Sequence, residues 1–398
     1  METIFRSYNR RLDATEDELR RYLYDRIDWD ERLIGIKGMR GVGKTTMLLH
    51  RIKSEFPDRS KALYASLDNI WFSAHTLIEL VEYAYTHGVT HIFLDEVHNY
   101  PNWIREMKNI YDDFPKLHVV FTGSSLLKVD NSLADLSRRL RMYTLNGLSF
   151  REYLAITGVA NFPTASLEEI LSDHVTLASK ITSEITILPH FENYIKAGYY
   201  PFFNETNNVE SYFEKLQNAI NTVITNDIPA IETIEHETLR KTKRLLYLLA
   251  QMTPFTPNIT RLCETLATTR NQLMRLLAIL ERARLLCLLN TDGKNLKAIG
   301  KPEKILFDNP NLMAAISSSP DIGAMRESFV ASMVTNAHTI SYPPVGDLLI
   351  DGKYTLEIGG KNKGFTQIRD TPESFVAADG IETGFGNKIP IWLFGFLY

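Results

Sequence analysis

The sequence contains few cysteines and no long apolar run. Its 398 residues include only two cysteines, Cys263 and Cys287. Two cysteines exclude a disulfide framework and suit a reducing compartment. No stretch of the sequence comes close to a run of about 18 uncharged apolar residues, the length that a membrane-spanning helix needs. Residues 1–23 are charged and lack the apolar core of a signal peptide. These absences predict a cytoplasmic protein without a membrane partner.

The chain is long for one hydrophobic core, and its charge is unevenly distributed. A length of 398 residues with 44% hydrophobic and 23% charged residues predicts a globular chain of two or three domains. The formal net charge is −4, but residues 239–304 hold 13 Lys and Arg against four Asp and Glu, a local +9 that leaves −13 elsewhere. Such asymmetry is typical of a basic module that binds nucleic acid. A solvated helix face remains the alternative.

A glycine-rich stretch at residues 38–45, GMRGVGKT, fits the phosphate-binding pattern G-x-x-x-x-G-K-[ST]. Glycines let backbone N–H groups wrap a phosphate, and the helix expected at 45–55 directs its positive end at the same anion. We expect Lys44 to reach the β- and γ-phosphates and to assist catalysis there, and the Thr45 hydroxyl to hold Mg²⁺. The residues expected to bind nucleotide are Gly38, Gly41, Val42, Gly43, Lys44, Thr45 and Thr46.

An apolar strand expected at residues 91–95 ends in two carboxylates, as a Walker B segment does. Asp95 is expected to hold Mg²⁺ together with Thr45, and Glu96 to polarise the attacking water. A second carboxylate at this place favours water over another phosphate acceptor, so the sequence predicts an ATPase.

Another apolar strand, at residues 117–121, runs into Thr122-Gly123-Ser124-Ser125. In P-loop ATPases of the AAA+ kind a polar residue at this strand end senses the γ-phosphate. Ser124 is the candidate sensor, with Ser125 close behind. An ordinary turn remains the alternative.

Expected strands and helices alternate along the first 150 residues. Strands are expected near residues 33–37, 61–66, 91–95, 117–121 and 140–145, and helices near 45–55, 74–87, 102–113 and 131–139. Such alternation predicts an α/β fold, the parallel sheet of a P-loop NTPase covered by helices. Capping boxes at 149–152 and 166–169 then open a helical region that continues to about residue 235.

The basic segment has the element order of a winged helix-turn-helix. Helices are expected at residues 259–267 and 270–283, a strand at 285–290 and a return strand at 295–299. The side chains expected on the open side of the recognition helix are Arg270, Asn271, Gln272 and Arg275. A purely structural module remains the alternative.

The combined motifs resemble bacterial and archaeal predicted ATPases of the AAA+ superfamily that carry a C-terminal domain of unknown function. The matching pieces, which together cover nearly the whole chain, are GMRGVGKTT, LDEVHNYPNWIREMKNIYDDFP, VVFTGSS, LSRRLRMYTLNGLSFREYL, KILFDNPNL, GDLLIDGKYTLEIGGKNKGFTQI and IPIWLFGFLY. The resemblance implies an ATPase core, a winged-helix portion and a small α/β domain like that of restriction endonucleases. It brings no settled cellular role.

In that family an arginine stands shortly before the LSF segment, commonly preceded by glycine. Arg139 occupies this place, with Arg138 where the glycine would be, and Arg141 is a competitor. An arginine here could stabilise charge on the transferring phosphate, within one chain or across a subunit interface. A solvated basic turn remains the alternative.

The C-terminal region departs from the restriction-type nuclease motif PD-(D/E)xK at its lysine. Asp347 and Glu357 stand where two adjacent strands would bring carboxylates onto one metal. The motif lysine belongs two residues after the second acid, where this sequence has Gly359, and the nearest lysine is Lys361. Positions 357, 359 and 361 share one face of a strand, so Lys361 would point the right way but lie too far along. We therefore expect a nuclease-like fold without cleavage.

These observations predict four segments. Residues 1–155 form a P-loop ATPase domain of the AAA+ kind and residues 156–235 a helical connector. Residues 236–310 form a winged helix-turn-helix and residues 311–398 a PD-(D/E)xK-like domain. The predicted function is Mg²⁺-dependent ATP binding and hydrolysis that drives a conformational switch, with double-stranded DNA as the candidate partner. A protein partner or self-association stays open. Two alternatives also stay open, a winged-helix regulator whose slow ATPase acts as a timer and a metal-dependent DNA nuclease.

Overall fold

The computed structural model of the chain describes residues 1–15, 20–124, 136, 138–231, 234–251, 257–291 and 301–398. The chain divides into two compact units, one of residues 1–146 with 226–233 and the other of 147–225 with 234–398. The four segments expected from the sequence are a finer division and stay a prediction. None of the helices in the described ranges is both long and apolar enough to cross a membrane.

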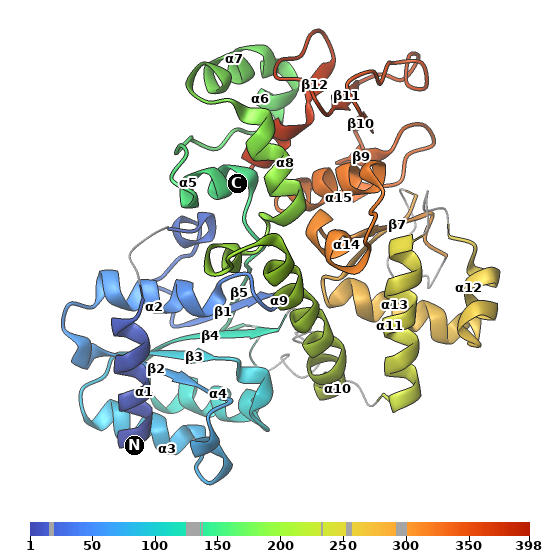
Figure 1. Cartoon of the computed structure of the whole chain (residues 1–398). Coiled ribbons are helices and arrows are strands. Elements are labelled where there is room, and N and C mark those ends of the chain that lie inside the picture. The colour runs from blue at the N-terminus through green and yellow to red at the C-terminus, as the bar shows by residue number, and fades with distance from the viewer. Residues whose placement is uncertain (16–19, 125–135, 137, 232–233, 252–256, 292–300) are drawn as a thin grey trace. The chain divides into compact units, whose positions relative to one another are not determined.

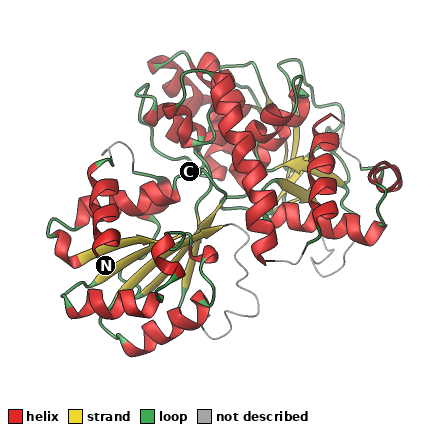
Figure 2. Cartoon of the chain, turned by 60° about the horizontal axis from the view of Figure 1, so that its bottom comes forward, coloured by secondary structure: helices red, strands yellow, loops and turns green. Residues whose placement is uncertain are grey.

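The first unit is a parallel sheet with helices on both faces (Figures 1 and 2). Its strands lie in the order β2-β3-β4-β1-β5, and every neighbouring pair is parallel. The strands are β1 (Leu33–Gly38), β2 (Ala62–Ser66), β3 (His91–Asp95), β4 (His118–Ser124) and β5 (Arg141–Thr144). The helices are α1 (Glu2–Asp13), α2 (Lys44–Glu55), α3 (Leu77–Thr86) and α4 (Trp103–Asp113). The inner strands are apolar and buried on both faces, as parallel strands usually are, and the predicted α/β fold is confirmed.

The strand order positions the candidate site. Strand β4 lies between β1 and β3, and the three strands are parallel. Their carboxyl ends therefore meet at one edge of the sheet. Gly38 at the end of β1 pairs with Ser124 at the end of β4, and β3 ends alongside at Asp95. The helix expected at 131–139 falls largely outside the described residues, as does Ser125.

The second unit begins with helices, and its basic part ends in a short hairpin. Its helices up to that hairpin are α5 (Phe150–Ile156), α6 (Leu167–Ser172), α7 (His174–Glu184), α8 (Ile187–Ala197), α9 (Val209–Thr222), α11 (His236–Gln251), α12 (Ile259–Leu266) and α13 (Arg270–Arg282). Both predicted capping boxes, at Ser149 and Ser166, are present. Strand β6 (Leu286–Leu289) pairs antiparallel with β7 (Lys304–Phe307). The return strand was expected at 295–299, which lies outside the described residues, and the partner of β6 is β7.

A small mixed sheet completes the second unit. The order is β12-β11-β10-β9-β8, with β9 antiparallel to both of its neighbours and the other pairs parallel. The strands are β8 (Ile340–Ser341), β9 (Leu348–Ile350), β10 (Tyr354–Gly359), β11 (Ser374–Ala378) and β12 (Lys388–Pro390), preceded by α14 (Pro310–Ile316) and α15 (Ile322–Val334). Helix α15 packs against β10. Asp347 directly precedes β9 and Glu357 lies on β10, as the sequence predicted.

Candidate nucleotide-binding site

The loop between β1 and α2 depends on glycine for two different reasons. Gly41 and Gly43 have φ angles of 89° and 95°, in the left-handed region that side chains disfavour. Gly38 is needed for space, because a Cβ there would collide with the carbonyl oxygen of Leu145. The buried Arg21 braces the loop by donating to the carbonyl oxygen of Val42 at 2.6 Å. The loop therefore has the backbone that the phosphate-binding pattern requires.

The Lys44 side chain is buried in this loop. Its Nζ donates to the carbonyl oxygens of Gly38, at 2.9 Å, and Met39, at 3.1 Å. Burial lowers the pKa of the Lys44 ammonium, while the charges of Glu96 and Asp95 oppose that shift. Thr46, the next nucleotide candidate, is exposed at the start of α2. The lysine is thus held over the loop that the glycines shape.

Thr45 and Asp95 lie together, as the metal prediction requires. Thr45 Oγ1 donates to Asp95 Oδ2 at 2.6 Å. Hydroxyl and carboxylate oxygens suit Mg²⁺, which is usually held by one or two protein groups with water and phosphate oxygens. Within the described ranges, no group of three or more His, Cys, Asp or Glu side chains could hold a metal ion. The pair therefore fits a Mg²⁺ ion that is shared with a nucleotide.

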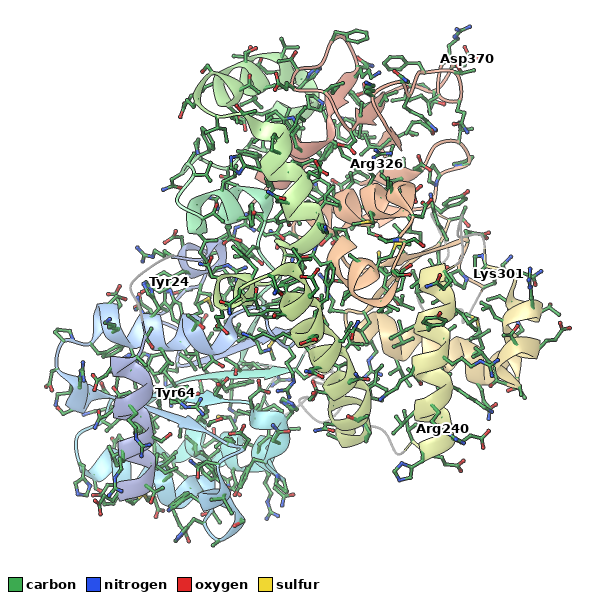
Figure 3. The ribbon with its side chains drawn as sticks, viewed as in Figure 1. Tyr24, Tyr64, Arg240, Lys301, Arg326 and Asp370 are labelled. Carbon is green, nitrogen blue, oxygen red and sulfur yellow. The ribbon has the colours of Figure 1, made fainter. Side chains whose placement is uncertain are left out.

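Two residues that the sequence did not single out also hold Asp95. Tyr64 on β2 donates to Asp95 Oδ2 at 2.8 Å, and Thr122 on β4 donates to Asp95 Oδ1. Tyr64, labelled in Figure 3, also accepts from Arg11 of α1 at 2.9 Å. Burial raises the pKa of Tyr64, and the charge of Asp95 adds to that shift. The phenol therefore stays protonated, and Asp95 is oriented by hydroxyl donors.

Glu96 follows Asp95 in an unusual backbone conformation. Its φ of 55° lies in the left-handed region, which costs a residue with a side chain about 1–2 kcal/mol. The Glu96 N–H donates to Thr122 Oγ1 at 3.2 Å. Its carboxylate is 17% exposed and lies 3.4 Å from His98 Nε2. Glu96 is thus a partly exposed carboxylate next to the buried Asp95, a position that suits a general base.

The sensor candidate on β4 does not act alone. Ser124 is buried, and its N–H donates to His98 Nδ1 at 3.3 Å. Thr122, two residues earlier, contacts Asp95 through its hydroxyl and receives the N–H of Glu96. The expectation named Ser124, with Ser125 close behind, and gave Thr122 no role. Because side chains alternate along a strand, Thr122 and Ser124 share one face, and both belong to the site.

Arg139 does not lie at the phosphate loop of its own chain. It precedes β5, whose first residue, Arg141, pairs with Ile34 at the start of β1, whereas the loop follows the end of β1. Arg139 forms an ion pair with Asp112 in the last turn of α4 at 3.1 Å. Arg141, the competitor, pairs with Glu31 at 2.9 Å. Action of Arg139 across a subunit interface stays a prediction.

A polar cluster of Arg40, His98 and Asp227 completes the surroundings of Glu96. Arg40 belongs to the phosphate loop, and its guanidinium lies 3.3 Å from Asp227 Oδ1. Asp227 ends a π-helical turn, Val223–Asp227, that continues α9. It is 187 residues from Arg40 along the chain, so no local pattern could have predicted this contact. The helical region of the sequence therefore contributes a residue to the site.

The predicted recognition helix, α13, exposes the expected side chains. Arg270, Asn271, Gln272 and Arg275 are all exposed. Gln272 also closes a capping box, because its Oε1 accepts from the Thr269 N–H at 3.3 Å. The amide oxygen of Gln272 is therefore used inside the helix.

Some of the positive charge in the basic segment is neutralised within the fold. Arg284 pairs with the buried Asp308 at 3.0 Å. Lys304, at 9% exposure, lies 2.7 Å from Glu327 and 3.1 Å from Asp347. The outward charge is therefore smaller than the local sequence count suggests.

The carboxylates expected at a nuclease site form a cluster with two lysines. Asp347 accepts from the Ile358 N–H at 2.8 Å and from Lys304. Glu357, at 2% exposure, forms an ion pair with Lys363. Lys361, which the sequence placed too far along the strand, is exposed, and Lys363 makes the contact with Glu357. Lys363 can reach Glu357 because Gly359 has no side chain. A Cβ at Gly359 would lie only 2.8 Å from the Lys363 side chain.

Family comparisons match two parts of the chain. An AAA domain matches residues 30–154, and a domain of unknown function, DUF8612, matches residues 188–321. The first match contains the phosphate loop, Asp95, Glu96 and Ser124. An uncharacterized protein of Methanocaldococcus jannaschii is 27% identical over 388 residues, which cover 89% of this chain and 81% of the relative.

Solved structures give weaker similarities. The ORC1 protein of Aeropyrum pernix in complex with DNA aligns at a TM-score of 0.32 with 12% identity, covering 78% of this chain and 91% of that one. AMPPCP-bound DnaA from Aquifex aeolicus aligns at a TM-score of 0.29 with 14% identity, covering 70% and 87%. Scores this low do not establish a shared overall fold.

Proposed function

We propose that this chain, whose residues 30–154 match an AAA domain, binds ATP with Mg²⁺ and hydrolyses it. The observation that supports this most directly is the 2.6 Å contact between Thr45 Oγ1 and Asp95 Oδ2. It joins the first residues of α2 to the end of β3, beside a glycine loop with a left-handed backbone. Hydroxyl and carboxylate oxygens meet there, which suits a Mg²⁺ ion bound together with phosphate.

The residues divide the work of hydrolysis. Lys44 Nζ exchanges its bonds to the Gly38 and Met39 carbonyl oxygens for phosphate oxygens. Thr45 and Asp95 would hold Mg²⁺, which would supply positive charge to offset the charge developing on the phosphate. Glu96 orients the attacking water and accepts its proton. Thr122 and Ser124 would register the γ-phosphate, a role supported by their contacts with Asp95, Glu96 and His98.

We further propose that hydrolysis works as a conformational switch. Asp227, which contacts Arg40 of the phosphate loop, lies in the segment that joins α9 to α11. A change in the loop is thereby passed to the chain that leads into the basic helices. Double-stranded DNA is the proposed partner, bound through exposed residues of α13. A slow timer ATPase on a DNA-bound regulator is the second candidate, supported by the same residues.

Turnover by the purified protein tests this proposal. We expect Mg²⁺-dependent ATP hydrolysis that EDTA abolishes. Lys44→Ala should weaken ATP binding by about tenfold or more, because the phosphate loses its main counter-charge. Glu96→Gln should bind ATP within about threefold of wild type but lose about 100-fold in kcat, a typical general-base contribution. Calorimetry measures binding, and phosphate release measures turnover.

Two outcomes would contradict the proposal or sort its versions. Wild-type protein without turnover, or Glu96→Gln with wild-type turnover, would refute the assigned chemistry. Asp113→Asn, an exposed change at the end of α4, is the control and should leave turnover unchanged. Double-stranded and single-stranded DNA are then added. Stimulation by DNA favours a motor or switch, and unchanged turnover favours the timer.

A further inference from the structure

A buried histidine, His98, lies next to the carboxylate of Glu96. The His98 side chain is 3% exposed, and its Nε2 lies 3.4 Å from Glu96 Oε2. The same nitrogen also lies 3.8 Å from Asp227 Oδ1, and the side chain of Asp227 is likewise 3% exposed. His98 thus stands between the proposed general base and an aspartate from a distant part of the sequence.

The backbone fixes which nitrogen of His98 carries the proton. The Ser124 N–H donates to His98 Nδ1 at 3.3 Å, so Nδ1 must present a lone pair. In the neutral imidazole the proton is then on Nε2, the nitrogen that lies near the carboxylates of Glu96 and Asp227. Among the described residues, Nε2 has no partner in hydrogen-bond geometry. A small shift of either carboxylate would complete a bond to it.

Asp227 is held in place from the phosphate loop. The guanidinium of Arg40 lies 3.3 Å from Asp227 Oδ1. Burial raises the pKa of Asp227, but His98 and Arg40 outweigh burial and keep that pKa below its usual range. The aspartate is therefore ionised and attracts the Nε2–H of His98. The Asp227 carboxylate thus contacts Arg40 of the phosphate loop and also lies near His98, which is next to Glu96.

We propose that His98 and Asp227 are positioning residues for Glu96. His98 holds one carboxylate oxygen of Glu96 and leaves the other for water, and Asp227 with the Ser124 N–H fixes the imidazole from two sides. A base oriented by a third group is a common catalytic arrangement. Because Asp227 belongs to the segment between α9 and α11, a displacement of that segment loosens the base and slows hydrolysis. This inference rests on the proposed ATPase function.

Kinetics separate positioning from general folding effects. His98→Ala should lower kcat by about tenfold or more with the ATP dissociation constant changed by less than about threefold. Asp227→Asn should lower kcat by about three- to tenfold. The double variant should be no slower than His98→Ala, because Asp227 acts through His98. His98→Gln, whose amide can donate in place of Nε2, should recover part of the loss. His87→Ala, an exposed histidine after α3, is the matched control.

A second readout does not require turnover. Nitrogen chemical shifts of ¹⁵N-labelled His98 should report an unprotonated Nδ1 and a protonated Nε2, and should change in both Glu96→Gln and Asp227→Asn. Unchanged shifts in both variants, or additive losses of kcat in the double variant, would overturn the positioning proposal. A wild type without ATPase activity would overturn the proposed function instead, while the shifts still decide whether Glu96 and Asp227 act on the imidazole.

Discussion

Single charged residues in this chain respond strongly to burial. Lys44 is one example, and Glu327 on α15 is another. Burial raises the pKa of Glu327 to about 7, against the opposing charge of Lys304, and Asp347 adds to the increase. The pKa of Lys304 is raised as well, because Glu327 and Asp347 outweigh the effect of its burial. At neutral pH the lysine is charged, whereas Glu327 titrates.

The raised pKa of Glu327 predicts a pH-dependent stability of definite sign. Below about pH 4.5 the carboxyl is protonated in both the folded and the unfolded chain. Between about pH 4.5 and 7 the unfolded chain releases this proton and the folded chain retains it, so the contribution to stability falls as pH rises. The full difference is about 1–3 kcal/mol.

Glu327→Gln should remove this dependence. Relative to wild type, the variant should gain about 1–3 kcal/mol in the free energy of unfolding between pH 5 and pH 7. Urea unfolding at both pH values measures the difference, and comparison with wild type cancels the other titrating groups. Parallel pH profiles of the two proteins would show that Glu327 is ionised in the folded chain.

At the scale of elements, the end of β1 has no room for a side chain. A Cβ at Gly38 would collide with the backbone oxygen of Leu145, which cannot move without disturbing the residues after β5. Gly38→Ala should therefore cost about 2 kcal/mol or more and lower the apparent Tm by about 4 °C or more. Gly364→Ala is the matched control, because nothing lies within 4 Å of its Cβ. Thermal unfolding followed by circular dichroism compares the two, and equal Tm values would contradict the steric argument.

Elements were predictable where their signals are local. The strands of the first sheet and the loop glycines follow from apolar runs and from a motif of eight residues. The partners of Asp95 and Glu96 were harder to predict from the sequence. Strand order brings Tyr64 to Asp95, and a helical turn far along the chain brings Asp227 near Glu96. Lys363 was missed for a related reason. A strand pattern places Lys361 on the correct face, but β10 ends at Gly359 and the chain then turns.

Helix α13 carries a prediction about DNA. Arg270 and Arg275 are exposed on this helix, and each phosphate they neutralise would release counterions. Arg270→Ala combined with Arg275→Ala should weaken duplex binding and flatten the slope of log affinity against log salt by about 1–2. Fluorescence anisotropy with a labelled duplex at several salt concentrations measures both quantities. Lys180→Ala, on the exposed surface of α7, should change neither. Absence of DNA affinity at low salt would leave a structural role for the module.

At the scale of the whole molecule, two carboxylate clusters among the described residues, one in each unit, differ in the groups that contact them. Around Asp95 the close donors are the hydroxyls of Thr45, Tyr64 and Thr122. Hydroxyls orient a carboxylate but leave its negative charge for a cation. In the second unit, Lys304 and Lys363 bring two ammonium groups to Glu327, Asp347 and Glu357. The proposed Mg²⁺ site therefore has carboxylate charge left for a cation, whereas the carboxylates of the second unit are already paired with ammonium groups.

The last prediction follows from this difference. A metal-dependent nuclease needs carboxylates that hold a cation and a lysine beside the attacking water. Here Lys304 lies between Glu327 and Asp347, and Lys363 is paired with Glu357, whose pKa burial raises. We expect the purified protein to leave plasmid and linear DNA intact in Mg²⁺ or Mn²⁺, as gel electrophoresis can measure, in a preparation that still binds ATP. Cutting that requires metal and disappears in Asp347→Ala or Glu357→Ala would mean that both lysines leave the cluster when metal and DNA bind.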